Sequence, residues 1–128
     1  MKQTIFKEKY PLFSYEIAKS ETSKKSVDEI IAYFKEKIEA HPIATYIATF
    51  DHFAHTTSLA EHSIHPDIKD VKNIIFCFGA EIPTSKVAAV RPRSIGVCEM
   101  EEKFVIDFME APNEKANKFM ENWTTSLT

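Results

Sequence analysis

Two stretches of the chain repeat their apolar residues every three or four positions, the spacing that places them on one face of an α-helix. The first lies between Ser26 and Pro42, and the second follows Asn113. Ser26 and Glu29 have the spacing of a capping box, in which both side chains bond to backbone N–H groups at the start of a helix. The two apolar stripes are Val27, Ile30, Ile31, Phe34 and Ile38, and then Ala116, Phe119, Met120, Trp123 and Leu127. Both patterns predict amphipathic helices that bury one face.

Other segments are short and rich in branched and aromatic residues, and turn-forming residues bound them, which is typical of β-strands. The expected strands are Phe6–Ile17, Ile43–Phe50, Asn73–Phe78, Ile95–Glu99 and Phe104–Met109. Pro11 interrupts the first of these, which is therefore a strand or a bent hairpin arm. Met100–Lys103 suits the turn of a hairpin between the last two. In the last strand Ile106 and the phenylalanines share one face, and Asp107 points to the other.

The order of these elements is strand, helix, strand, short helix, three strands and a final helix. Helices are too few for a repeated strand–helix–strand chain with a parallel sheet. The pattern predicts an α+β fold, with a mainly antiparallel sheet and two main helices packed on one face. We expect a single domain over residues 1–128, in which residues 1–25 form an N-terminal strand or arm and residues 26–125 form the core.

Composition limits the class of function. The chain has 128 residues, of which 44% are hydrophobic and 27% charged, as in a globular domain. A net charge of −3 does not favour a nucleic-acid partner. Two glycines are too few for a phosphate-binding loop, so a nucleotide-driven enzyme is not expected. There is no long apolar segment or secretory signal, which predicts a cytoplasmic protein with no membrane contact. Cys77 and Cys98 are then expected as reduced thiols.

Histidines are concentrated in Asp51–His65, a segment expected to contain a short helix with His55, Leu59 and His62 on one face. Imidazole and carboxylate groups are common ligands of transition metals. The candidate metal ligands are Asp51, His52, His55 and His62. No established zinc spacing is present, however. The alternative is that Asp51 and His52 cap a helix or turn, and that the other histidines are solvated. No cofactor is identified, and a transition metal at this cluster is a hypothesis.

Arg91 and Arg93 flank Pro92 and would project from the same face of an extended strand. Two guanidinium groups in this arrangement can bind a carboxylate or phosphate through paired hydrogen bonds. The alternative is that they pair with acidic residues of the protein itself, such as Glu99 or Glu110. The sequence leaves both interpretations open.

Four segments resemble a bacterial family of unknown function, the one numbered three hundred and two, as a distant branch. They are Ala48–His52, Ile74–Gly79, Ser94–Glu99 and Phe108–Pro112. The likeness covers residues 26–123 and places Asp51, His52 and Gly79 at family positions. It implies a fold similar to one half of the TATA-binding protein, and a homodimer, but it brings no established reaction.

Three classes of function follow. The favoured one is a small binding or sensing module, whose polar pocket lies near His52, His55, Arg91 and Arg93 and takes a small anion or a metal-bound species. The second is a structural protein that acts through dimerisation. The third is an enzyme with His52 as general base. The enzyme is disfavoured because Asp51 and His52, as neighbours in a strand, would point to opposite faces.

Overall fold

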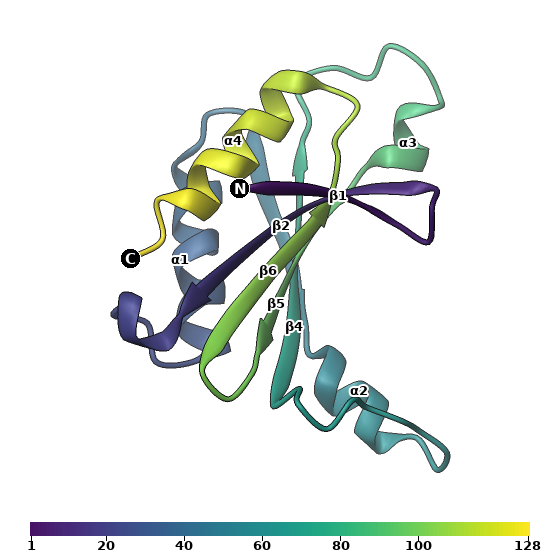
Figure 1. The fold of residues 1–128 in the computed structure, drawn as a ribbon. Coiled ribbons are helices and arrows are strands. Elements are labelled where there is room, and N and C mark those ends of the chain that lie inside the picture. Colours follow the sequence, from purple (N-terminus) through teal and green to yellow (C-terminus); the bar gives the residue numbers. More distant parts are fainter.

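One antiparallel sheet of six strands organises the chain, and the computed structural model describes all residues 1–128 (Figure 1). The strands are β1 (Lys2–Phe6), β2 (Tyr10–Ala18), β3 (Ala44–Phe50), β4 (Asp70–Phe78), β5 (Arg93–Glu99) and β6 (Lys103–Met109). Their order across the sheet is β1-β2-β6-β5-β4-β3. The helices are α1 (Val27–Ala40), α2 (His52–Ser58), α3 (Val87–Val90) and α4 (Glu114–Thr125), and a short 3-10 turn covers Lys19–Glu21.

The long helices α1 and α4 bury their apolar stripes against one face of the sheet, so the predicted α+β class is confirmed (Figure 1). Alternate residues of each strand point toward these helices. In β4 they include Ile74 and Phe76, and in β6 they include Phe104 and Ile106, all of which are fully buried. Asp107 points to the opposite face of the sheet, as the alternation predicted.

Both long helices begin at the residues that the sequence indicated. The backbone N–H of Glu29 donates to Oγ of Ser26 at 3.2 Å, while the Glu29 carboxylate accepts from the N–H of Lys25. The Asn113 side chain accepts from two backbone N–H groups in the first turn of α4. These contacts satisfy N–H groups that have no partner inside the helix.

The first two strands form a hairpin that belongs to the sheet. Its turn lies at Lys7 and Glu8, both in the left-handed region with φ of 50° and 61°, so Pro11 is inside β2 instead of at the bend. Strand β1 was not predicted, because its residues alternate weakly and it lies at the edge. Strand β2 pairs with β6 from Leu12 to Ala18 and contributes the buried Ile17 to the core.

Two short helices differ from the prediction. The helix in the histidine-rich segment ends at Ser58, so His62 lies beyond it and the expected face of His55, Leu59 and His62 does not form. Helix α3 was not predicted, because four residues are too few to show a periodic pattern. No helix in the structure has the length and apolar composition needed to cross a membrane.

Candidate functional site

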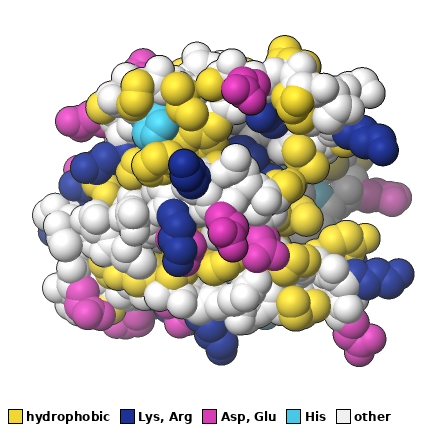
Figure 2. Space-filling model, turned by 90° about the horizontal axis from the view of Figure 1, so that it is seen from above, with side chains coloured by type: hydrophobic (Ala, Val, Ile, Leu, Met, Phe, Trp, Pro, Cys, Tyr) yellow, Lys and Arg dark blue, Asp and Glu magenta, His cyan; other side chains and the backbone are white.

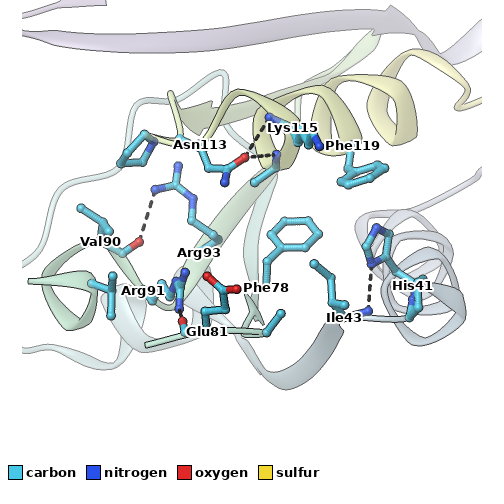
Figure 3. A pocket seen from close by; sticks show the side chains of 16 residues that line it. His41, Ile43, Phe78, Glu81, Val90, Arg91, Arg93, Asn113, Lys115 and Phe119 are labelled. Atoms are coloured by element: carbon cyan, nitrogen blue, oxygen red, sulfur yellow. Dashed lines mark hydrogen bonds between the residues drawn. The ribbon is translucent and has the colours of Figure 1, made fainter. Parts of the chain in front are cut away.

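A cavity of about 670 Å³ lies at the end of the sheet where α1 ends and α4 begins (Figure 3). Sites for small molecules typically have volumes of several hundred cubic ångströms and mostly apolar walls. The apolar part of this wall consists of Pro42, Ile43, Phe78, Ala80, Val87, Val90, Ala111, Pro112, Ala116 and Phe119. Figure 2 shows this end of the molecule from above, with hydrophobic side chains interspersed with charged side chains of both signs. The cavity therefore combines an apolar interior with charged groups.

Arg93 is the first residue of β5 and lies on the same side of that strand as the buried Ile95, because side chains alternate along a strand. This register directs its guanidinium toward α4 and into the cavity (Figure 3). One terminal nitrogen donates to the carbonyl oxygen of Val90 at 3.5 Å, and the other donates to the carbonyl oxygen of Met109. The Nε atom is shielded from solvent and has no hydrogen-bond partner.

The charge of Arg93 has no ion-pair partner within the protein. Neither it nor Arg91 forms an ion pair with any acidic side chain of the chain. The acids suggested by the sequence are engaged elsewhere: Glu99 pairs with Lys19 at 2.6 Å, and Glu110 accepts from Gln3. Burial lowers the pKa of the Arg93 guanidinium from its usual value. This shift indicates that the protein supplies less stabilisation of the cation than water does.

Other charged groups line the same cavity. Arg91 is held by a hydrogen bond of 2.6 Å from its guanidinium to the carbonyl oxygen of Glu81. Lys115, from the first turn of α4, forms no ion pair. Three cationic side chains thus face one carboxylate, that of Glu81, and the N-terminus of α4 adds partial positive charge. The electrostatic character of the cavity favours an anion.

The cavity holds half of the residues that the sequence proposed for a binding pocket. Arg91 and Arg93 both line it, whereas His52 and His55 do not. These histidines belong to α2, which projects from the opposite end of the sheet (Figure 1). The two rings lie beside Phe50, at centroid distances of 5.2 Å and 5.6 Å. A common pocket of these four side chains is therefore not formed.

The candidate metal ligands do not converge either. Nowhere in the structure do three or more His, Cys, Asp or Glu side chains form a group that could hold one metal ion. Asp51 instead caps α2 by accepting from the N–H of Ala54 at 2.9 Å, and its second oxygen lies 3.6 Å from Lys72. His62 contacts the carbonyl oxygen of Leu59. The capping role considered for Asp51 is the arrangement observed.

Sequence reasoning missed His41 and Glu81 as members of the site. His41 follows the last residue of α1, where its ring packs against aromatic side chains, and Glu81 lies in the loop after β4. Neither belongs to a periodic pattern or to a motif. These two residues could have been found only from the fact that the ends of helices and strands meet at one end of the sheet. That fact cannot be used until the strand order is known.

The fold is that of an α+β protein with a cavity of about 670 Å³ at one end of its sheet. Along residues 1–128 the chain matches the model of a family of unknown function, DUF6858, and it belongs to that family. No curated protein and no solved structure matches it.

The resemblance to the family numbered three hundred and two is therefore wrong. The match over the whole chain is to a different family. The segments that carried the likeness are antiparallel strands or their ends; Ile74–Gly79, for example, is the end of β4 with one following residue, and Ser94–Glu99 is nearly all of β5. Such apolar strand endings are common to many α+β folds, so short stretches of them are weak markers of a family. The TATA-binding-protein-like fold loses its support with that resemblance, and the homodimer stays a prediction.

Proposed function

We propose that this protein is a binding module for a small molecule with an apolar body and one anionic group, and that Arg93 binds the anion. The observation that carries this proposal is the guanidinium of Arg93, which lines the cavity and forms no ion pair with any acidic side chain. Burying a charged group without a partner of opposite charge costs free energy. A carboxylate or similar anion in the cavity would supply the missing negative charge.

A purely structural role for Arg93 explains less of the geometry. Its bonds to the carbonyl oxygens of Val90 and Met109 hold the start of β5 against the end of β6. A neutral donor of the same reach could make such bonds without the cost of burying a charge. The Nε atom makes neither of these two bonds, and the cationic surroundings increase the cost of the charge.

Binding is better supported than catalysis. The cavity wall contains no serine, threonine, cysteine or tyrosine, so a hydroxyl or thiol nucleophile is not at hand. His52, the general base of the enzyme hypothesis, belongs to α2 and does not line this cavity. Two of the polar groups that line it, the guanidiniums of Arg91 and Arg93, are donors held in place by backbone carbonyl groups, which suits recognition of a ligand.

A fluorescent probe with the proposed chemistry tests this function. The aromatic sulfonate 8-anilinonaphthalene-1-sulfonate has an apolar body and one anionic group, and its emission rises when it leaves water. The Arg93→Gln variant keeps a donor for the nearby carbonyl groups but removes the charge. Loss of charged hydrogen bonds worth about 1.5–3 kcal/mol should weaken binding by roughly 10- to 150-fold.

Two further variants make the result specific to the cavity. Lys118→Gln changes the charge by the same amount on α4 but lies outside the cavity, and it should bind the probe like the wild type. Val90→Trp should block the cavity, and because Val90 is 39% exposed the larger side chain should not prevent folding. Circular dichroism and thermal melting verify that each variant is folded. Equal affinity for the probe in Arg93→Gln, Val90→Trp and wild type would contradict the proposal.

A further inference from the structure

One wall of the cavity is aromatic. The ring of His41 lies 4.3 Å from that of Phe119 in an edge-to-face arrangement, and 5.4 Å from that of Phe78. The rings of Phe78 and Phe119 are 6.0 Å apart and nearly parallel, with 30° between their planes. Figure 3 shows Arg93 and His41 on opposite sides of Phe78. Phe78 therefore lies between the charged group and the ring of His41, and the aromatic wall extends away from Arg93.

The three rings are held in place by the protein. Phe78 is 8% exposed and stacks on Trp123 at 5.6 Å, so the wall continues the aromatic part of the core. The Nδ1 atom of His41 accepts a hydrogen bond of 3.2 Å from the backbone N–H of Ile43, which fixes the orientation of the imidazole. Phe119, on the apolar stripe of α4, is nevertheless 36% exposed where it lines the cavity. A rigid surface of this kind loses little freedom when a ligand binds.

From this geometry we infer that the ligand is an aromatic carboxylic acid, with its ring against Phe78 and Phe119 and its carboxylate at Arg93. This inference rests on the function proposed above and names the class of ligand for the same site. Aromatic rings attract one another in offset or edge-to-face arrangements beyond the effect of buried area. An aliphatic acid of the same size gains free energy only from burying apolar area, and it also loses the conformational entropy of its flexible chain. Planar, singly charged acids are therefore preferred over fatty acids.

Calorimetric titration with two acids that have equal numbers of carbon atoms tests the preference. The probes are 2-naphthoate and undecanoate, titrated into wild type, Arg93→Gln, Phe119→Leu and Phe53→Leu. We expect wild type to bind 2-naphthoate at least about threefold more tightly than undecanoate, from the added attraction between rings. Phe119→Leu should reduce that preference and leave the affinity for undecanoate nearly unchanged. Phe53→Leu, the same substitution on α2 away from the cavity, should keep the wild-type preference.

The outcomes separate this inference from the proposed function. If undecanoate binds as tightly as 2-naphthoate or more tightly, and Arg93→Gln weakens both acids, the aromatic class is wrong and the anion-binding function stands. If neither acid binds, both ideas fail. If the preference survives in Phe119→Leu, the aromatic wall does not select the ligand and the inference is overturned. Melting curves of the two leucine variants verify that they are folded.

Discussion

Replacing Tyr33 by phenylalanine tests how the two long helices are joined. The Tyr33 hydroxyl in α1 donates to the carbonyl oxygen of Trp123 in α4 at 2.5 Å. The last carbonyl groups of a helix lack partners within it. In α4 the carbonyl oxygens of Asn122 and Thr124 accept from Ser126 and Leu127, whereas that of Trp123 depends on the tyrosine. The hydroxyl thus completes the C-terminal turn of α4 from a neighbouring helix.

The size of the effect follows from what phenylalanine leaves behind. Packing of the ring is retained, because Tyr33 contacts Phe34 and the core through its ring. The loss is one partly buried hydrogen bond beside the Trp123 side chain. A typical hydrogen bond contributes about 0.5–1.5 kcal/mol to stability, so a loss of about 1 kcal/mol is expected. With a urea m-value of about 1.5 kcal/mol/M, the midpoint should fall by about 0.7 M.

The assay is equilibrium unfolding in urea, followed by circular dichroism and by the fluorescence of the one tryptophan. Tyr15→Phe is the matched control, because Tyr15 also packs on the core but its hydroxyl makes no hydrogen bond. It should shift the midpoint by no more than a few tenths of a molar unit. A Tyr33→Phe midpoint equal to that of wild type, or equal losses in both variants, would refute the reasoning. If the m-value is unchanged, the shift in the urea midpoint does not come from a change in the denatured state.

The Tyr33→Phe substitution should also change how the stability of the protein depends on pH under alkaline conditions. Burial raises the pKa of the Tyr33 hydroxyl above the usual value of about 10. The folded protein therefore keeps this proton at pH values where the unfolded chain loses it. The stabilisation is complete below pH 10 and is lost as the pH rises through the raised pKa. The difference in stability between wild type and Tyr33→Phe should shrink over this range.

Two further predictions concern ionisable groups that are partly buried. Burial raises the pKa of Asp70 above 3.8 although Lys72 opposes the shift, so stability should fall as the pH rises through the window just above 3.8. Asp70→Asn should remove that loss and melt at a higher temperature than wild type at pH 7, and a lower melting temperature would contradict this. Burial and then the charge of Asp107 raise the pKa of the Cys98 thiol. In a Cys77→Ala background Cys98 should react slowly with iodoacetamide at pH 8, and Asp107→Asn should accelerate the reaction several-fold; equal rates would refute the electrostatic cause.

The elements that the sequence predicted best are those whose signals are local. The stripe of α1, its Ser26 cap and the Asn113 cap of α4 depend on neighbours within one or two turns, and the structure contains all three. The β5–β6 hairpin is equally local, with its turn closed by a bond from the N–H of Met100 to the carbonyl oxygen of Lys103. In the segment 51–65 the end of the helix was predicted wrongly, because the last turn of a helix and a loop can have the same polar composition.

The site was harder to predict because its parts meet only in three dimensions. Arg91 and Arg93 were proposed from their spacing, and both line the cavity. The histidines attracted attention by their density, but α2 places His52 and His55 beyond the other end of β4. His41 contributes more to the cavity than either, yet a single histidine after a helix has no distinctive pattern in a sequence.

The position of β2 beside β6 has a consequence for how the protein is made. β2 is synthesised early and pairs locally with β1, but its other partner, β6, lies roughly ninety residues later, as in the pairing of Ile17 with Phe104. Closing so long a loop is slow compared with forming a local hairpin. During synthesis, the side chains of Phe13 and Ile17 therefore lack their native contacts with β6 until nearly the whole chain has left the ribosome. During synthesis these residues form a natural contact point for chaperones, and crowding or starvation that stalls translation after β5 would leave them open to aggregation.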